Sequence, residues 1–207
     1  MPTLPMFPLG TVLLPGEVLP LQVFEPRYRA LVHDCLMASD PEFGIVMIER
    51  GSEVGGGDQR SMRGTVARID QLGQFPDGRI GMRAVGTRRI RVERWLEDDP
   101  YPRADVVDWP DDTDDEPLGE EIERCRARAT TILGLANELG HDATLDIALA
   151  ADATVASYQL VAAVPLGPAD RQRLLCATGP RHRVRLLADA LDDAEAVLRF
   201  RLGSPGS

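Results

Sequence analysis

Short apolar or alternating stretches, separated by turn residues, fill the first half of the chain. Apolar and polar residues alternate in 65–69, 80–84 and 88–95, whereas 18–24 and 43–48 are mainly apolar, and 103–107 can complete the set of strands. Pro20 interrupts 18–24, so that segment belongs at a sheet edge or a strand start. The turn Pro76-Asp77-Gly78 predicts that the two stretches beside it pair as a hairpin. Around seven short strands at near-regular spacing predict a barrel or a sandwich.

Apolar residues recur every three or four positions in the second half, which is the spacing of helices. The helices predicted there are 118–139, 152–164, 168–176 and 178–200. One further helix, 26–38, is predicted within the strand-rich half, with Pro26 at its first position, where the missing N–H costs nothing. The apolar face of that helix comprises Tyr28, Leu31, Val32, Cys35 and Leu36. Strands followed by helices predict an α+β chain with two segregated halves.

The predicted helix 118–139 carries an unbroken heptad seam. The seam residues are Leu118, Ile122, Cys125, Ala129, Ile132, Ala136 and Leu139. Three of them are small, which favours close packing against the helix's own subdomain. The alternative is a homodimer formed through helix 118–139.

The formal net charge of −10 is concentrated in one short connection. Residues 106–123 contain nine acidic residues and no basic residue, whereas the segments on either side are nearly neutral. Two prolines and dense like charge disfavour a packed element there, so the connection is predicted to be a solvated linker. The predicted organisation is a β subdomain at 1–107, an acidic linker at 108–117, a helical subdomain at 118–202 and a disordered tail at 203–207.

All 23 basic residues are arginine, and the chain contains no lysine. This absence excludes Schiff-base chemistry, a Ser-Lys dyad and the phosphate-binding P-loop, each of which needs an ε-amine. The three histidines are scattered, no cysteine pair has zinc spacing, and no serine lies in a G-x-S-x-G motif. The sequence therefore predicts no catalytic, metal or cofactor site, and the protein is expected not to be an enzyme.

The three cysteines, Cys35, Cys125 and Cys176, are far apart and lie in predicted helices, which favours buried free thiols. No window reaches about 18 uninterrupted apolar residues, and the N-terminus lacks the pattern of a signal peptide. We therefore expect no membrane association and a cytoplasmic location.

Arginine clusters are the remaining charged signal. They comprise Arg79, Arg83, Arg88, Arg89, Arg91 and Arg94 on adjacent strands, and Arg181, Arg183 and Arg185 near the start of the last helix. With Trp95 or Tyr101 for stacking, such a set could bind single-stranded nucleic acid. The strand-rich half nevertheless has more acidic than basic residues, so ion-paired surface arginines are favoured and nucleic acid is disfavoured as a partner.

Several motifs in order closely resemble the Lon protease N-terminal, or substrate-binding, domain, most of all its stand-alone bacterial form. They are the proline-punctuated start at Leu4–Leu9, the FEPRYR box at Phe24–Arg29, GTVARI at Gly64–Ile69, the Pro76-Asp77-Gly78 turn, Gly86–Val92, and SYQLVAAVPL from Ser157. The resemblance spans nearly the whole chain. It implies a PUA-like β pseudo-barrel followed by an α-helical bundle.

The resemblance also implies a role. Full-length Lon joins this region to an ATPase and a Ser-Lys peptidase domain, whose motifs this sequence lacks. The implied function is a non-catalytic module that binds unfolded or exposed segments of client proteins in proteostasis. An RNA-binding PUA-like module is the alternative.

The FEPRYR box supplies the candidate peptide-binding residues Phe24, Glu25, Arg27 and Tyr28. Their architectural interpretation is that Glu25 accepts backbone N–H bonds at the helix start, Arg27 pairs across the barrel and Tyr28 joins the buried face. Their functional interpretation is a surface groove in which Phe24 and Arg27 meet a peptide. The glycine-rich loop at 51–60 is predicted to be mobile.

Overall fold

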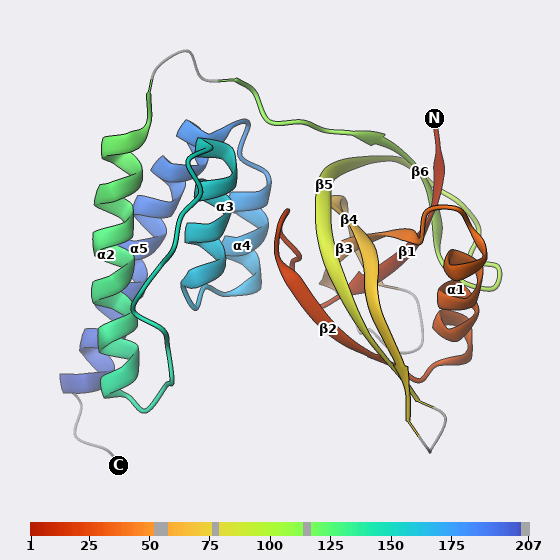
Figure 1. The fold of residues 1–207 in the computed structure, drawn as a ribbon, viewed down its shortest axis with the longest axis horizontal. Coiled ribbons are helices and arrows are strands. Elements are labelled where there is room, and N and C mark those ends of the chain that lie inside the picture. The colour runs from red at the N-terminus through yellow and green to blue at the C-terminus, as the bar shows by residue number, and fades with distance from the viewer. Residues whose placement is uncertain (52–57, 76–78, 114–116, 204–207) are drawn as a thin grey trace. The chain divides into compact units, whose positions relative to one another are not determined.

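A computed structural model describes residues 1–51, 58–75, 79–113 and 117–203, and the chain forms two compact units, Met1–Pro110 and Asp111–Ser207 (Figure 1). The predictions for the glycine-rich loop, the Pro76-Asp77-Gly78 turn, the centre of the acidic linker and the last four residues lie wholly or mostly outside the described residues. The α+β class predicted from the sequence is confirmed, because the first unit holds all six strands and the second holds helices.

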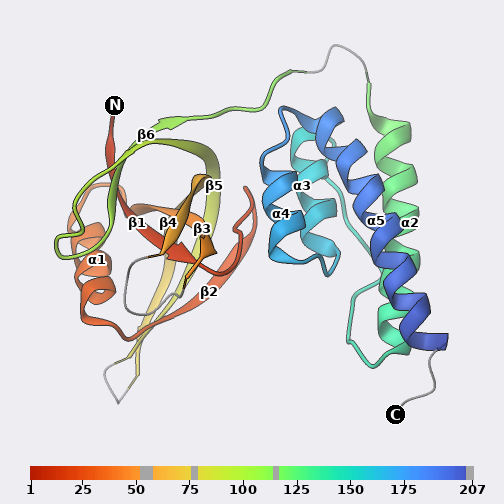
Figure 2. The same cartoon turned by 180° about the vertical axis from the view of Figure 1, so that it is seen from behind.

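The first unit is a mixed sheet that closes on itself. Its elements are β1 Thr3–Leu9, β2 Val18–Val23, α1 Pro26–Met37, β3 Glu42–Arg50, β4 Gln59–Gln74, β5 Ile80–Trp95 and β6 Arg103–Asp108. The strand order is β2-β5-β4-β3-β1-β6, and β6 also pairs with β5, so five strands form a ring and β2 extends it beyond β5 (Figures 1 and 2). Among the described strands, β1 and β3 form the one parallel pair, and the other pairs are antiparallel.

The number of strands differs from the sequence prediction, since the described residues form six strands rather than about seven. The segments predicted as separate strands at 80–84 and 88–95 are one continuous strand, β5. Its pairing with β4 shifts by one residue at Thr87, between Gly86 and Arg88. This β-bulge interrupts the alternating pattern, so the sequence indicates two strands where there is one. Strand β1 was not predicted as a strand because it contains Pro5 and Pro8, which cannot donate ladder hydrogen bonds.

The barrel core has two parts. One is a cluster that α1 covers with Tyr28, Leu31, Val32 and Cys35, packed against apolar side chains of five strands. The other is a smaller cluster around Met6, Val46, Ile90 and Val106. The predicted face of α1 is confirmed except at Leu36, which is 46% exposed.

The second unit is a helical bundle. Its helices are α2 Gly119–Glu138, α3 Ala153–Ala163, α4 Pro168–Leu175 and α5 Pro180–Gly203, close to the predicted ranges. The long helices α2 and α5 lie side by side and run in the same direction, and α3 also packs against α2 (Figures 1 and 2). Among the described residues, no helix is both long and apolar enough to cross a bilayer.

The heptad seam of α2 is used within this unit. Leu118, Ile122, Cys125, Ala129, Ile132 and Ala136 are all buried in the single chain. The small seam residues thus allow α5 to approach closely, as the sequence predicted for intramolecular packing. A homodimer through helix 118–139 would have to use its other faces.

Candidate functional site

The segment Phe24–Tyr28 joins strand β2 to helix α1, and one of its predicted contacts is wrong. Glu25 is the N-cap residue, but its side chain makes no capping hydrogen bond. Its carboxylate instead accepts from Nε of Arg27 at 3.0 Å. Capping favours short side chains such as Ser and Asp, whereas the longer Glu25 side chain reaches the neighbouring guanidinium. Pro26 stands at the predicted start of the helix.

Tyr28 anchors this segment in the core. Its side chain is 4% exposed and its ring stacks on Phe7 with 4.0 Å between centroids and 6° between planes. The guanidinium of Arg27 lies 4.5 Å from the centre of the same ring. Glu25, Arg27, Tyr28 and Phe7 therefore contact one another in that order, from the surface into the barrel. This stack fixes the start of α1.

Burial raises the pKa of the Tyr28 hydroxyl to about 12, and the Arg27 charge only partly opposes this shift. Because the folded state favours the neutral phenol, its contribution to stability is intact below pH 10 and is lost as the pH rises from 10 towards 12. We expect Tyr28→Phe, which keeps the ring, to lose about 1.4 kcal/mol less unfolding free energy than the parent between pH 8 and pH 11. Denaturant titrations at the two pH values measure this difference, and an equal loss in both proteins would refute the assignment.

A cavity of about 210 Å³ opens beside this segment. Its lining residues are Phe7, Leu9, Pro20, Leu21, Gln22, Val23, Phe24, Glu25 and Tyr28. Most of the lining is apolar, and sites for drug-sized ligands begin at about 300 Å³, so the cavity suits one large apolar side chain. The structure thus brings Phe24, Glu25 and Tyr28 together at one cavity, whereas Arg27 lies on the far side of Tyr28's ring stack and is not part of the lining.

Phe24 is the exposed apolar residue of this cavity, with 57% of its surface accessible. It follows directly on β2, which among the described strands pairs only with β5 and therefore has an open edge. Pro20, in the middle of β2, lacks an N–H and limits how far another strand could extend the sheet there. An apolar side chain seated in the cavity beside Phe24 is therefore better supported than a full added strand.

The strand arginines do not form a free basic face. Arg83 pairs with Asp70, Arg88 with Glu42 and Asp108, Arg91 with Glu93, and Arg94 with Asp105. Arg89 is 3% exposed, and its guanidinium lies 4.2 Å from the centre of the Trp109 ring. Tyr101 is buried and donates its hydroxyl to Asp34, so its ring cannot stack on a base. These contacts favour the ion-paired interpretation of the cluster.

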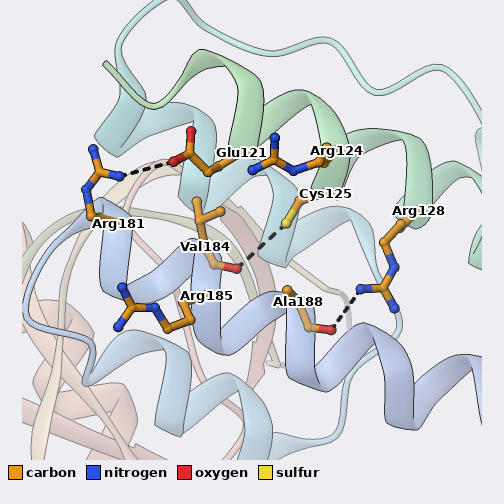
Figure 3. Close-up of a pocket in the computed structure, with 8 residues that line it drawn as sticks. All are labelled: Glu121, Arg124, Cys125, Arg128, Arg181, Val184, Arg185 and Ala188. Atoms are coloured by element: carbon orange, nitrogen blue, oxygen red, sulfur yellow. Dashed lines mark hydrogen bonds and ion pairs between the residues drawn. The ribbon is translucent and has the colours of Figure 1, made fainter. Parts of the chain in front are cut away.

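A second cavity, of about 320 Å³, lies between α2 and α5 in the helical unit (Figure 3). Its lining residues are Glu121, Arg124, Cys125, Arg128, Arg181, Val184, Arg185 and Ala188. The sequence indicated Arg181 and Arg185 as part of a cluster but gave no reason to join them to Arg124 and Arg128. The sequence pattern common to both helices is that their groove arginines are four residues, or about one helical turn, apart.

Arg183, predicted to lie with Arg181 and Arg185, instead points into the bundle and is 0% exposed. Two residues correspond to about half a helical turn, so Arg183 faces away from its neighbours. Its guanidinium donates to Ser157 Oγ at 2.9 Å, Tyr158 Oη at 2.7 Å and the carbonyl of Leu174 at 3.2 Å, and it pairs with Asp111. Tyr158 also donates to Asp111 at 2.9 Å.

The cysteines are all free thiols. Burial raises the pKa of Cys35 to about 11 and raises that of Cys125 as well, so both thiols are held in the protonated, unreactive form. Within the described residues, no three His, Cys, Asp or Glu side chains are grouped in a way that could hold a metal ion.

The chain matches the family model described as the ATP-dependent protease La (LON) substrate-binding domain over residues 3–193. The crystal structure of a Lon N-terminal domain protein from Xanthomonas campestris shares 32% identity and a TM-score of 0.67, over 91% of this chain and 98% of that one. The N-terminal domain of a Mycobacterium avium complex Lon protease has a TM-score of 0.69 over 93% and 99% of the two chains, with 18% identity, which shows a shared fold.

Full-length relatives are much longer. Lon protease 2 of Herpetosiphon aurantiacus is 26% identical over 201 residues, which cover 95% of this chain and 24% of that protein. Lon protease 2 of Myxococcus xanthus is 27% identical over 206 residues, again 95% of this chain and 24% of the relative. The chain therefore spans about a quarter of the length of these relatives.

Proposed function

Because this chain belongs to the family of Lon substrate-binding domains, we propose that it is a protein-binding module for unfolded or exposed segments of client proteins. The observation that carries the proposal is the apolar cavity beside Phe24, next to the open edge of β2. An exposed phenylalanine at the mouth of a cavity of side-chain size can hold an apolar residue of an extended segment. In this binding mode the cavity holds one side chain of the client segment, and the flanking backbone lies along the surface.

In this proposal the module binds client proteins and catalyses no reaction. Its sequence contains neither a P-loop nor any lysine for a Ser-Lys peptidase, and its buried thiols are kept protonated. In this proposal the module serves proteostasis in the cytoplasm as an adaptor or a holdase. The RNA-binding alternative is less well supported, because most of the strand arginines that would contact phosphate are already paired with carboxylates.

A peptide titration with a matched pair of variants tests the proposal. The probe is a fluorescent nonapeptide with a central Phe flanked by Gly and Ser. Burying an apolar side chain contributes about 1.5–3 kcal/mol, so we expect Phe24→Ser to weaken binding of this probe by about tenfold or more. Fluorescence anisotropy gives the two dissociation constants.

Phe200→Ser is the control, because Phe200 is 75% exposed on α5, far from the cavity in sequence and in a different unit. It should bind the probe as the parent does. If the parent protein shows no binding tighter than about 100 μM, or if the two variants behave alike, the proposal fails.

A further inference from the structure

The groove between α2 and α5 is basic within an acidic unit. Four of its eight lining residues are arginines, and Glu121 is its one carboxylate. Residues 111–207, by contrast, contain 17 acidic and 10 basic residues. Cys125, Val184 and Ala188 supply a small apolar floor, with the thiol of Cys125 donating to the carbonyl of Val184 at 3.7 Å (Figure 3).

Two of the four guanidinium groups are poorly compensated. Arg181 pairs with Glu121 at 3.1 Å, and Arg128 pairs with Asp192 and donates to the carbonyl of Ala188. Arg124 has only a long contact of 3.8 Å with Glu120, whose side chain is 91% exposed. Arg185 is exposed and makes no hydrogen bond or ion pair with the described part of the chain. The groove thus offers two fork-shaped donors on opposite walls.

The arginines form two parallel rows. The contacts Glu121–Arg181, Cys125–Val184 and Arg128–Ala188 advance together along both helices, so α2 and α5 are parallel at this point. Within each row the arginines are four residues apart, which places their Cα atoms about 6 Å apart along the helix. Arg124 and Arg185 belong to different rows, so the two poorly compensated guanidinium groups come from opposite walls of the groove (Figure 3).

We propose that this groove binds a short, extended acidic peptide segment of another protein, with carboxylates at alternate positions and a small apolar residue between them. The carboxylates pair with Arg124 and Arg185, and the small residue lies on the floor at Cys125 and Val184. This site belongs to the helical unit and is independent of the Phe24 cavity in the first unit.

A long polyanion fits this surface less well than a short peptide. Exposed carboxylates of Glu120, Asp189 and Asp192 lie on the same two helices, with side-chain exposures of 91%, 65% and 71%. A nucleic acid strand that continued along the helices would meet these like charges. A segment with two or three carboxylates meets fewer of these like charges than a continuous strand does.

The test is fluorescence anisotropy with a labelled nonapeptide that has a central Asp-Ala-Asp flanked by Gly and Ser, and a matched peptide with Asn-Ala-Asn. The variant Arg124→Gln/Arg185→Gln removes one groove arginine from each helix. Its control, Arg126→Gln/Arg199→Gln, removes one exposed arginine from each of the same helices outside the groove. Circular dichroism checks that both variants stay folded.

We expect the groove variant to bind the Asp peptide at least about tenfold more weakly than the parent, and the control variant to bind it within about twofold of the parent. The Asn peptide should not bind, and binding of the Asp peptide should weaken as salt rises. Equal affinities of the two variants, or equal binding of both peptides, would overturn the proposal. So would tighter binding of tripolyphosphate or a single-stranded oligonucleotide through the same arginines, which would make the groove a phosphate site. Phe24→Ser should leave this binding unchanged, so failure here and failure of the client-binding proposal can be told apart.

Discussion

Replacing Gly64 by alanine is expected to destabilise the barrel by about 3 kcal/mol or more, or to prevent its folding. A Cβ atom at Gly64 in β4 would overlap the carbonyl oxygen of Ile45 and lie 2.7 Å from Cγ1 of Val46. Both atoms belong to β3, where Val46 is the antiparallel pairing partner of Gly64 in β4. The overlapping oxygen is a backbone atom of a paired strand, so it cannot move without breaking the ladder. Denaturant unfolding followed by the fluorescence of the barrel tryptophans measures the loss.

Gly73→Ala is the matched control, because Gly73 lies in the same strand and an added Cβ would meet no atom within 4 Å. This variant should unfold within about 0.5 kcal/mol of the parent. If Gly64→Ala were as stable as Gly73→Ala, the close approach of β3 and β4 would not exist in solution.

Replacing Arg183 by methionine is expected to destabilise the helical unit by about 3–5 kcal/mol. Methionine is unbranched and replaces the aliphatic part of the arginine side chain but not its guanidinium, so the main loss is the set of hydrogen bonds to Ser157, Tyr158 and Leu174 and the pairing with Asp111. Asp111 would then keep only the Tyr158 hydroxyl among the contacts described above, with 12% of its side chain exposed. Unfolding followed by circular dichroism at 222 nm, which reports mainly on the helices, measures the effect in the full chain.

Arg185→Met, two residues further along the same helix, is the control for this loss. Arg185 is exposed and forms no ion pair within the described residues, so its replacement should change stability by no more than about 0.5 kcal/mol. Comparable losses in the two variants would contradict the buried network. Amide exchange should also show faster opening of α5 only in Arg183→Met.

Local patterns were enough to predict the helices and the main hairpin. Apolar residues at three- and four-residue spacing located every helix to within about three residues of its ends, because each of those helices buries one continuous face. A hairpin of β4 and β5 was also predicted from alternation on both sides of a turn, but its register differs from the prediction, because 65–69 pairs with 84–89 and 80–84 pairs with 69–74. These elements are formed by residues close together in the sequence, so local sequence patterns are enough to predict them.

Features that depend on distant partners were not predicted. Strand β1 is held between β3 and β6, and this pairing outweighs the cost of Pro5 and Pro8, which made the segment look irregular. Arg183 was assigned to the surface because its burial depends on Asp111, 72 residues earlier. The groove of α2 and α5 combines arginines from both ends of the helical unit. The Phe24 segment was found only through its family resemblance, and the pairing of Glu25 with Arg27 was not predicted.

The position of β1 also affects how the protein is made. Thr3 to Pro5 pair with Arg103 to Asp105, so β1 cannot complete its ladder until about 100 more residues have been synthesised. Until then the apolar residues of β1 and β3 are partly exposed, because β6 has not yet been added to the sheet. Aggregation can compete with folding during this time. The corresponding separation in the helical unit is shorter, since Asp111 and Arg183 are 72 residues apart. Slow translation before Arg103 should therefore lower the yield of folded barrel more than slow translation within the bundle.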